Sequence, residues 1–117
     1  MNSISTISNQ LKKSLTYPYY HQVNFIIKTE YVLKVRIYIN FESFIQIYRN
    51  DLFNSTNFIL IKDNNRIYAK DQIRGKWHTH PFNNSDFHDY SYKGIKPITL
   101  KQFLKETHSI LKKLSII

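Results

Sequence analysis

Three histidines fall close together in the second half of the chain. His78, His80 and His88 share this stretch with the carboxylates of Asp86 and Asp89. Histidine has an ordinary pKa near neutrality, so a pair can hold one neutral and one protonated imidazole. Such a pair can take the proton of a ribose 2′-OH and give one to the leaving 5′-oxygen. The residues therefore predict metal-independent RNA cleavage by general acid–base catalysis, with Asp86 or Asp89 orienting an imidazole.

Basic residues on both sides of the histidines could stabilise the negative charge that develops on a phosphate. We assign this phosphate-binding role to Arg74, Lys76, Lys93, Lys96, Lys101 and Lys105. The whole chain has 17 Lys and Arg against 8 Asp and Glu, a net charge of +9. A charge of this size attracts polyanions, so RNA is the first candidate partner and an acidic protein the second.

Two other interpretations of the same histidines stay open. His78 and His80 are one residue apart, so on an extended segment they point to one side, and His88 or Asp86 could complete a metal site. We rank this below acid–base catalysis because no fourth strong ligand is nearby, and we expect no metal or other cofactor. Alternatively, the histidines have no chemistry, and the protein is a non-catalytic basic accessory protein that binds nucleic acid or a partner.

The elements that position these residues are predicted from hydrophobic spacing. Apolar residues recur at helical intervals in residues 4–15, and Pro18 ends that helix. A final helix begins after Thr99, which forms a capping box with Gln102, and its N-terminus could bind a phosphate. Alternation of apolar and polar residues predicts strands at 23–28, 33–41, 43–48, 58–62 and 66–70.

These elements predict one α+β domain over residues 1–117. Its centre is an antiparallel β-meander of about five strands, flanked by an N-terminal and a C-terminal helix. The Asp63-Asn64-Asn65 segment forms a tight turn between the last two strands. We expect the histidines on the loop between the meander and the final helix, where binding and catalytic residues concentrate.

Composition also excludes several classes of function. The chain has no cysteine, so disulfides, thiolate metal sites and cysteine nucleophiles are absent. No glycine-rich phosphate loop is found, which argues against ATP or GTP as a substrate. Residues 1–15 have no apolar core of signal-peptide length, and no apolar run approaches a membrane span. We therefore expect a cytoplasmic protein that does not associate with membranes.

Three motifs occur in a fixed order in the second half of the chain: Lys76-Trp77-His78-Thr79-His80-Pro81, Phe87-His88-Asp89 and Pro97-Ile98-Thr99-Leu100. With the upstream hairpin at residues 63–68, they resemble the TumE-type family of toxins from prokaryotic toxin–antitoxin modules. Family members usually have further histidines where this chain has Tyr90 and Tyr92, and often an Asp-Asn pair in place of Gly75-Lys76. The resemblance implies a toxin that acts on RNA, is neutralised by a DNA-binding helix-turn-helix antitoxin, and uses the histidines at 78, 80 and 88.

Overall fold

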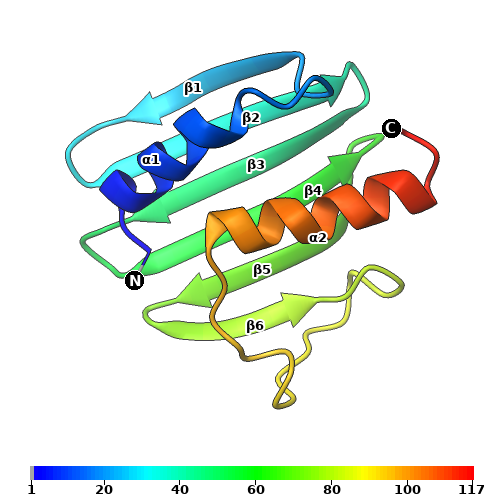
Figure 1. Cartoon of the computed structure of the whole chain (residues 1–117). Helices are drawn as coiled ribbons and strands as arrows, with labels where there is room; N and C mark the ends of the chain where they lie inside the picture. Colours follow the sequence, from blue (N-terminus) through cyan, green and yellow to red (C-terminus); the bar gives the residue numbers. More distant parts are fainter. Residues whose placement is uncertain (1) are drawn as a thin grey trace.

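The computed structural model describes residues 2–117 as an antiparallel sheet of six strands with two helices on one of its faces (Figure 1). The strands pair in chain order. They are β1 (Gln22–Lys28), β2 (Val32–Asn40), β3 (Ser43–Asn50), β4 (Ser55–Lys62), β5 (Asn65–Ile73) and β6 (Lys76–His80). The helices are α1 (Ile4–Ser14) and α2 (Leu100–Lys113). The predicted α+β meander between two helices is confirmed, with one strand more than the five expected.

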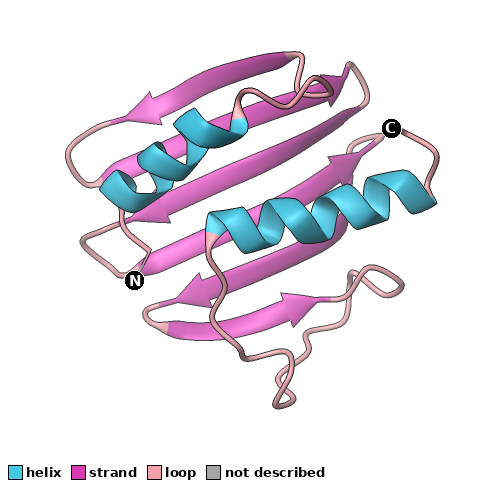
Figure 2. Cartoon of the chain, viewed as in Figure 1, coloured by secondary structure: helices cyan, strands magenta, loops and turns pink. Residues whose placement is uncertain are grey.

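Both helices, drawn in cyan in Figure 2, begin directly after an N-cap residue, Ser3 for α1 and Thr99 for α2. The predicted capping box of α2 is present: the backbone N–H of Gln102 donates to Thr99 Oγ1 at 3.2 Å. The next free donor, the Lys101 N–H, is bonded to Gln10 Oε1 at 3.1 Å. Two of the first N–H groups of α2 therefore already have partners within the chain. Neither helix within residues 2–117 is long and apolar enough to cross a membrane.

The two faces of the sheet differ in what covers them. Alternate residues of β2 to β5 are buried beneath the helices, where Phe103 of α2 packs on Phe58 and stacks on Tyr68. No helix of the described chain covers the other side, which we call the open face (Figure 1). Register and strand alternation assign to the open face Lys34, Arg36, Tyr38, Phe44, Gln46, Tyr48, Asn57, Arg66, Asp71, Lys76, His78 and His80.

Two tight turns with left-handed backbone set the register of the last three strands. The β4–β5 turn has Asp63 at φ 52° and Asn64 at φ 63°, in agreement with the turn predicted from these residue types. The β5–β6 turn has Arg74 at φ 49° and Gly75 at φ 87°. This second turn folds residues 76–80 back onto β5, so the expectation that they belong to a loop was wrong.

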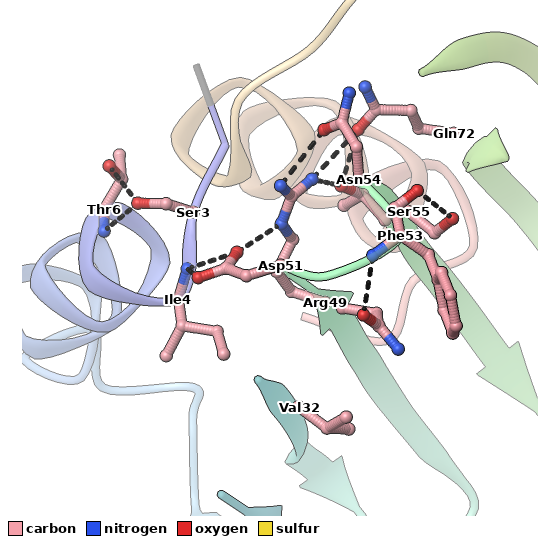
Figure 3. Close-up of polar contacts among 12 residues, drawn as sticks. Ser3, Ile4, Thr6, Val32, Arg49, Asp51, Phe53, Asn54, Ser55 and Gln72 are labelled. Atoms are coloured by element: carbon pink, nitrogen blue, oxygen red, sulfur yellow. Dashed lines mark hydrogen bonds and ion pairs between the residues drawn. The ribbon is translucent and has the colours of Figure 1, made fainter. Parts of the chain in front are cut away.

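A buried arginine near the end of β3, Arg49, connects the start of α1 to the turn between β3 and β4 (Figure 3). Arg49 Nε lies 2.8 Å from Asp51 Oδ1, and the Asp51 carboxylate also accepts from the backbone N–H of Ile4. The two Nη groups of Arg49 donate to Thr56 Oγ1 and Asn54 Oδ1. The buried charge is therefore neutralised and hydrogen-bonded, and it fixes where α1 begins.

Candidate functional site at the histidine cluster

Three imidazoles meet on the open face at the β6 edge of the sheet. Because side chains alternate along β6, His78 and His80 both point to the open face. The chain then returns beside β6, where Asp89 exchanges two backbone hydrogen bonds with Thr79, at 3.2 and 2.8 Å. His88 neighbours Asp89 in this pairing and points to the same side, with its ring centroid 4.5 Å from that of His80 and 5.3 Å from that of His78.

The carboxylate that contacts the histidines is Asp71, which faces His78 across β5 and β6. Asp71 Oδ2 lies 3.1 Å from His80 Nε2 and 3.3 Å from His78 Nε2. The two Nε2 atoms are themselves 3.1 Å apart. The exposed fractions of these side chains are 5% for His78, 2% for His80 and 14% for Asp71. The other Asp71 oxygen accepts a hydrogen bond from Asn57 Nδ2, which fixes the orientation of the carboxylate.

The hydrogen bonds of His80 define which of its nitrogens carries the proton. His80 Nδ1 lies 2.9 Å from the backbone oxygen of Ser85. A carbonyl oxygen can only accept, so Nδ1 is the protonated nitrogen, and in the neutral ring Nε2 then carries a lone pair. That lone pair faces Asp71 Oδ2 and His78 Nε2. A cation between these three atoms, either a proton or a metal ion, would stabilise the arrangement.

Burial and exposure give the histidines different chemical properties. Burial is the largest cause of a lowered pKa for His78, and the Asp71 carboxylate offsets it only in part. The neutral form of His78 is therefore favoured at neutral pH. His88 is exposed, and the exposed Tyr90 ring lies nearly parallel to its ring. Of the three imidazoles, His88 is the one that a large substrate can reach directly.

The predicted orienting carboxylates lie elsewhere. Asp86 is fully exposed, with an oxygen 3.8 Å from Arg66 Nη2. The Asp89 carboxylate accepts from the Ser91 backbone N–H at 2.9 Å. Hydrogen bonding from the Ser91 side chain, together with this backbone bond, lowers the pKa of Asp89. Within residues 2–117, neither carboxylate forms a hydrogen bond to a histidine, so Asp71 occupies the position that we had assigned to them. Pairing the strands across the Arg74-Gly75 turn would have identified it.

The predicted phosphate-binding residues divide between the two sides of the sheet. Lys93, Lys96 and Lys105 line a groove of about 560 Å³ together with Lys70, which was not among the predicted phosphate-binding residues, and with the carboxylate of Glu106. Lys70 pairs with the buried Phe58 and so points to the helix side, away from the histidines. This groove, which we call the lysine groove, therefore lies on the side of the sheet opposite the histidine cluster.

The other predicted cations lie in separate places. Lys101 contributes to a second groove, between the two helices. Arg74 lies at the β5–β6 turn, where its guanidinium is 4.9 Å from the centre of the Phe53 ring. Lys76 points to the open face two residues before His78, so it is the predicted cation that shares a face with the histidines.

Cations and aromatic rings continue from the histidine cluster across the open face. One row of paired residues crosses five strands, from Lys34 through Tyr48, Asn57 and Asp71 to His78. A second, parallel group contains Arg36, whose guanidinium lies 4.8 Å from the centre of the Phe44 ring and donates to Gln46. Phe44 in turn lies 5.3 Å from Tyr38. The open face therefore joins the site to a basic, aromatic surface.

Comparisons with known proteins leave the interpretation of the site to its own geometry. No protein-family model, curated protein or solved structure matched the chain. The resemblance to TumE-type toxins therefore rests on the sequence motifs alone and remains a prediction.

Proposed function

We propose that the protein is the toxin of a prokaryotic toxin–antitoxin module and that it cleaves RNA at the histidine cluster. The observation that carries the proposal is the exposed imidazole of His88, held beside the buried cluster of His78, His80 and Asp71. An imidazole that packs against neighbouring rings and stays accessible is a suitable general base for a ribose hydroxyl. The toxin role and the helix-turn-helix antitoxin partner are inferred from the motif resemblance.

In the proposed reaction, the ribose 2′-oxygen attacks the adjacent phosphorus, and the bond from phosphorus to the 5′-oxygen breaks. His88 accepts the 2′-OH proton, and a water molecule protonates the departing 5′-oxygen. The proton held by His88 then neutralises the hydroxide left by that water, which restores the neutral imidazole. The products are a 2′,3′-cyclic phosphate and a 5′-hydroxyl. His78 and His80 cannot take opposite sides of one phosphate while their Nε2 atoms are 3.1 Å apart on the same carboxylate. We therefore assign them to holding the site, with the Lys76 ammonium stabilising phosphate charge.

The open face supports RNA as the substrate. Its cations Lys34 and Arg36 can contact phosphates, and its rings Tyr38, Phe44 and Tyr48 can stack on unpaired bases, which is the usual combination for single-stranded nucleic acid. β2 is four strands from β6 in the sheet, a distance of about 19 Å at the usual strand spacing. A short single strand could therefore lie across this face and reach His88.

A second candidate function is a non-catalytic binding protein that uses the lysine groove. Lys70, Lys93, Lys96 and Lys105 converge there without any contribution from the histidines. Four cations around one groove suit an anionic backbone or an acidic protein segment. This alternative predicts that binding depends on the lysine groove and that substitution of His88 has no effect.

Controlled expression in bacteria tests the proposal. We expect the wild-type chain to arrest growth and His88→Ala to relieve the arrest while its thermal melting curve stays cooperative. His21→Ala is the matched control, because His21 is exposed and lies at the start of the sheet far from the cluster in the strand order. Arrest that persists in His88→Ala but disappears in Lys96→Glu/Lys105→Glu would contradict the ribonuclease and support the binding protein.

A further inference from the structure

Three potential ligand atoms on β5 and β6 form a nearly equilateral triangle. His78 Nε2, His80 Nε2 and Asp71 Oδ2 are separated by 3.1, 3.1 and 3.3 Å. Two ligands bonded at 2.0–2.1 Å to a tetrahedral ion lie about 3.3 Å apart. The spacing of these atoms is therefore the spacing of a coordination shell, and an ion would lie about 1 Å out of their plane at ordinary bond lengths.

The same three atoms require a positive charge between them. The protonated Nδ1 of His80 leaves its Nε2 lone pair in the neutral ring facing a carboxylate oxygen, where the His80 side chain is 2% exposed and the Asp71 side chain 14%. Two acceptors directed at each other in a buried site repel unless a cation lies between them. A divalent ion would satisfy both acceptors and the second imidazole together.

Two of the three ligand groups, His80 and Asp71, are also oriented by hydrogen bonds to their other polar atoms, as in known metal sites. His80 donates its other ring N–H to the carbonyl of Ser85, and Asp71 uses its second oxygen to accept from Asn57. Such outer contacts fix the tautomer of a ligating histidine and the orientation of a ligating carboxylate. Ser85 is held in turn by Arg66: its hydroxyl donates to the Arg66 carbonyl, and its own carbonyl accepts from the Arg66 guanidinium.

We infer that His78, His80 and Asp71 bind a divalent transition-metal ion of the zinc class. Two imidazoles and one carboxylate form a borderline donor set that suits Zn²⁺ and leaves a fourth position open. The three histidines offer nitrogens within 4.8 Å of one another, and His88 is the exposed one, so it stands beside the open position as a base and is not a ligand. This ligand set replaces the His78, His80 and His88 set considered from the sequence.

The inference depends on the triangle alone and does not require RNA to be the substrate. If the proposed function holds, the ion would add Lewis-acid stabilisation of the phosphate to the base provided by His88. The chemistry would then depend on a metal, in contrast to the metal-independent cleavage expected from the sequence.

Metal uptake can be measured directly on the full chain. Protein treated with a chelator and then dialysed is titrated with ZnCl₂ by isothermal calorimetry, and the bound zinc is counted by mass spectrometry. We expect one Zn²⁺ per chain in the wild type, and a loss of affinity of at least about 100-fold in Asp71→Asn and His80→Ala. His88→Ala should bind as the wild type does, and so should His108→Ala, whose ring is bonded to Tyr19. Co²⁺ added to the metal-free protein should give the visible absorption of a tetrahedral site.

Three results would overturn the inference. The first is the absence of saturable uptake by the wild type. The second is uptake that persists in Asp71→Asn and His80→Ala when both retain a wild-type circular dichroism spectrum. The third is loss of uptake in His88→Ala, which would place His88 among the ligands. RNA cleavage by the same preparations tests the proposed function independently of the metal site. Zinc uptake without cleavage would support the metal site and contradict the ribonuclease.

Discussion

Replacement of Gly94 by alanine should move the backbone segment that carries His88, although no histidine is itself substituted. A Cβ at Gly94 would lie 2.2 Å from the backbone oxygen of Asp89 and 2.5 Å from its Cγ. Both partners are held, because Asp89 is paired with Thr79 and the Gly94 carbonyl accepts from Thr79 Oγ1 at 2.7 Å. The chain must therefore shift at one of these contacts, and the segment that carries His88 shifts with it.

The size of the effect follows from the bonds at risk. Two backbone hydrogen bonds between Asp89 and Thr79 and the bond from Thr79 to Gly94 contribute about 1 kcal/mol each. We expect Gly94→Ala to lower the free energy of unfolding by about 2–3 kcal/mol and the melting temperature by about 10 °C. A displacement of His88 by about 1 Å should reduce RNA cleavage about 100-fold. Zinc uptake should persist because its ligands lie on β5 and β6.

Urea unfolding followed by circular dichroism measures the stability change, and cleavage of labelled RNA measures the activity. Gly75→Ala is the matched control, because the nearest atom to its added Cβ is the side-chain Nδ2 of Asn54 at 3.3 Å. Its positive φ predicts a loss of about 1 kcal/mol with unchanged cleavage. If Gly94→Ala unfolded at the wild-type urea concentration and cleaved RNA normally, the Asp89–Thr79 pairing would not be what positions His88.

Two further predictions concern the open face and the buried arginine. Lys34→Glu should raise the KM for single-stranded RNA, leave kcat unchanged and reduce the salt dependence of binding by about 0.7 in the logarithmic slope, because a phosphate contact far from His88 is lost. In steady-state assays over a range of salt concentrations, an effect no larger than that of Lys12→Glu, which makes the same charge change on α1, would contradict this. Arg49→Met should lower the free energy of unfolding by about 3 kcal/mol, because Asp51 and Thr56 lose a buried partner. A decrease of less than about 1 kcal/mol in the free energy of unfolding, measured with guanidinium, would contradict this prediction.

The meander was predictable because its strands alternate clearly. In β2, buried Leu33, Val35 and Ile37 alternate with the half-buried Lys34 and Arg36, so both the strand and its two faces can be read from the sequence. β6 was missed because its alternation is of a different kind. Trp77 and Thr79 lie on the core side of β6 and the histidines lie on the other side. Because histidine is neither clearly apolar nor clearly polar, this alternation did not predict a strand.

The proximity of the three histidines was predictable from their density in the sequence, and Asp71 was not. Asp71 meets His78 only because the Arg74-Gly75 turn sets a register that pairs the two residues across the hairpin. Gly75 favours a turn at this position, but the pair Arg-Gly predicts a tight turn less strongly than the pair Asp-Asn does. Asp86 and Asp89 are nearer to His88 in sequence, yet their carboxylates bond to Arg66 and Ser91. Proximity in the sequence therefore indicated the wrong carboxylates, because the strand register determines which carboxylate faces the histidines.

Cleavage at His88 can be measured by incubating a labelled single-stranded RNA with the purified protein and identifying the product ends by mass spectrometry. The wild type and His21→Ala should produce fragments that end in 2′,3′-cyclic phosphate and 5′-hydroxyl, and His88→Ala should leave the RNA intact. Equal cleavage by wild type and His88→Ala, or no cleavage by a wild-type protein that carries zinc and arrests growth, would contradict the account.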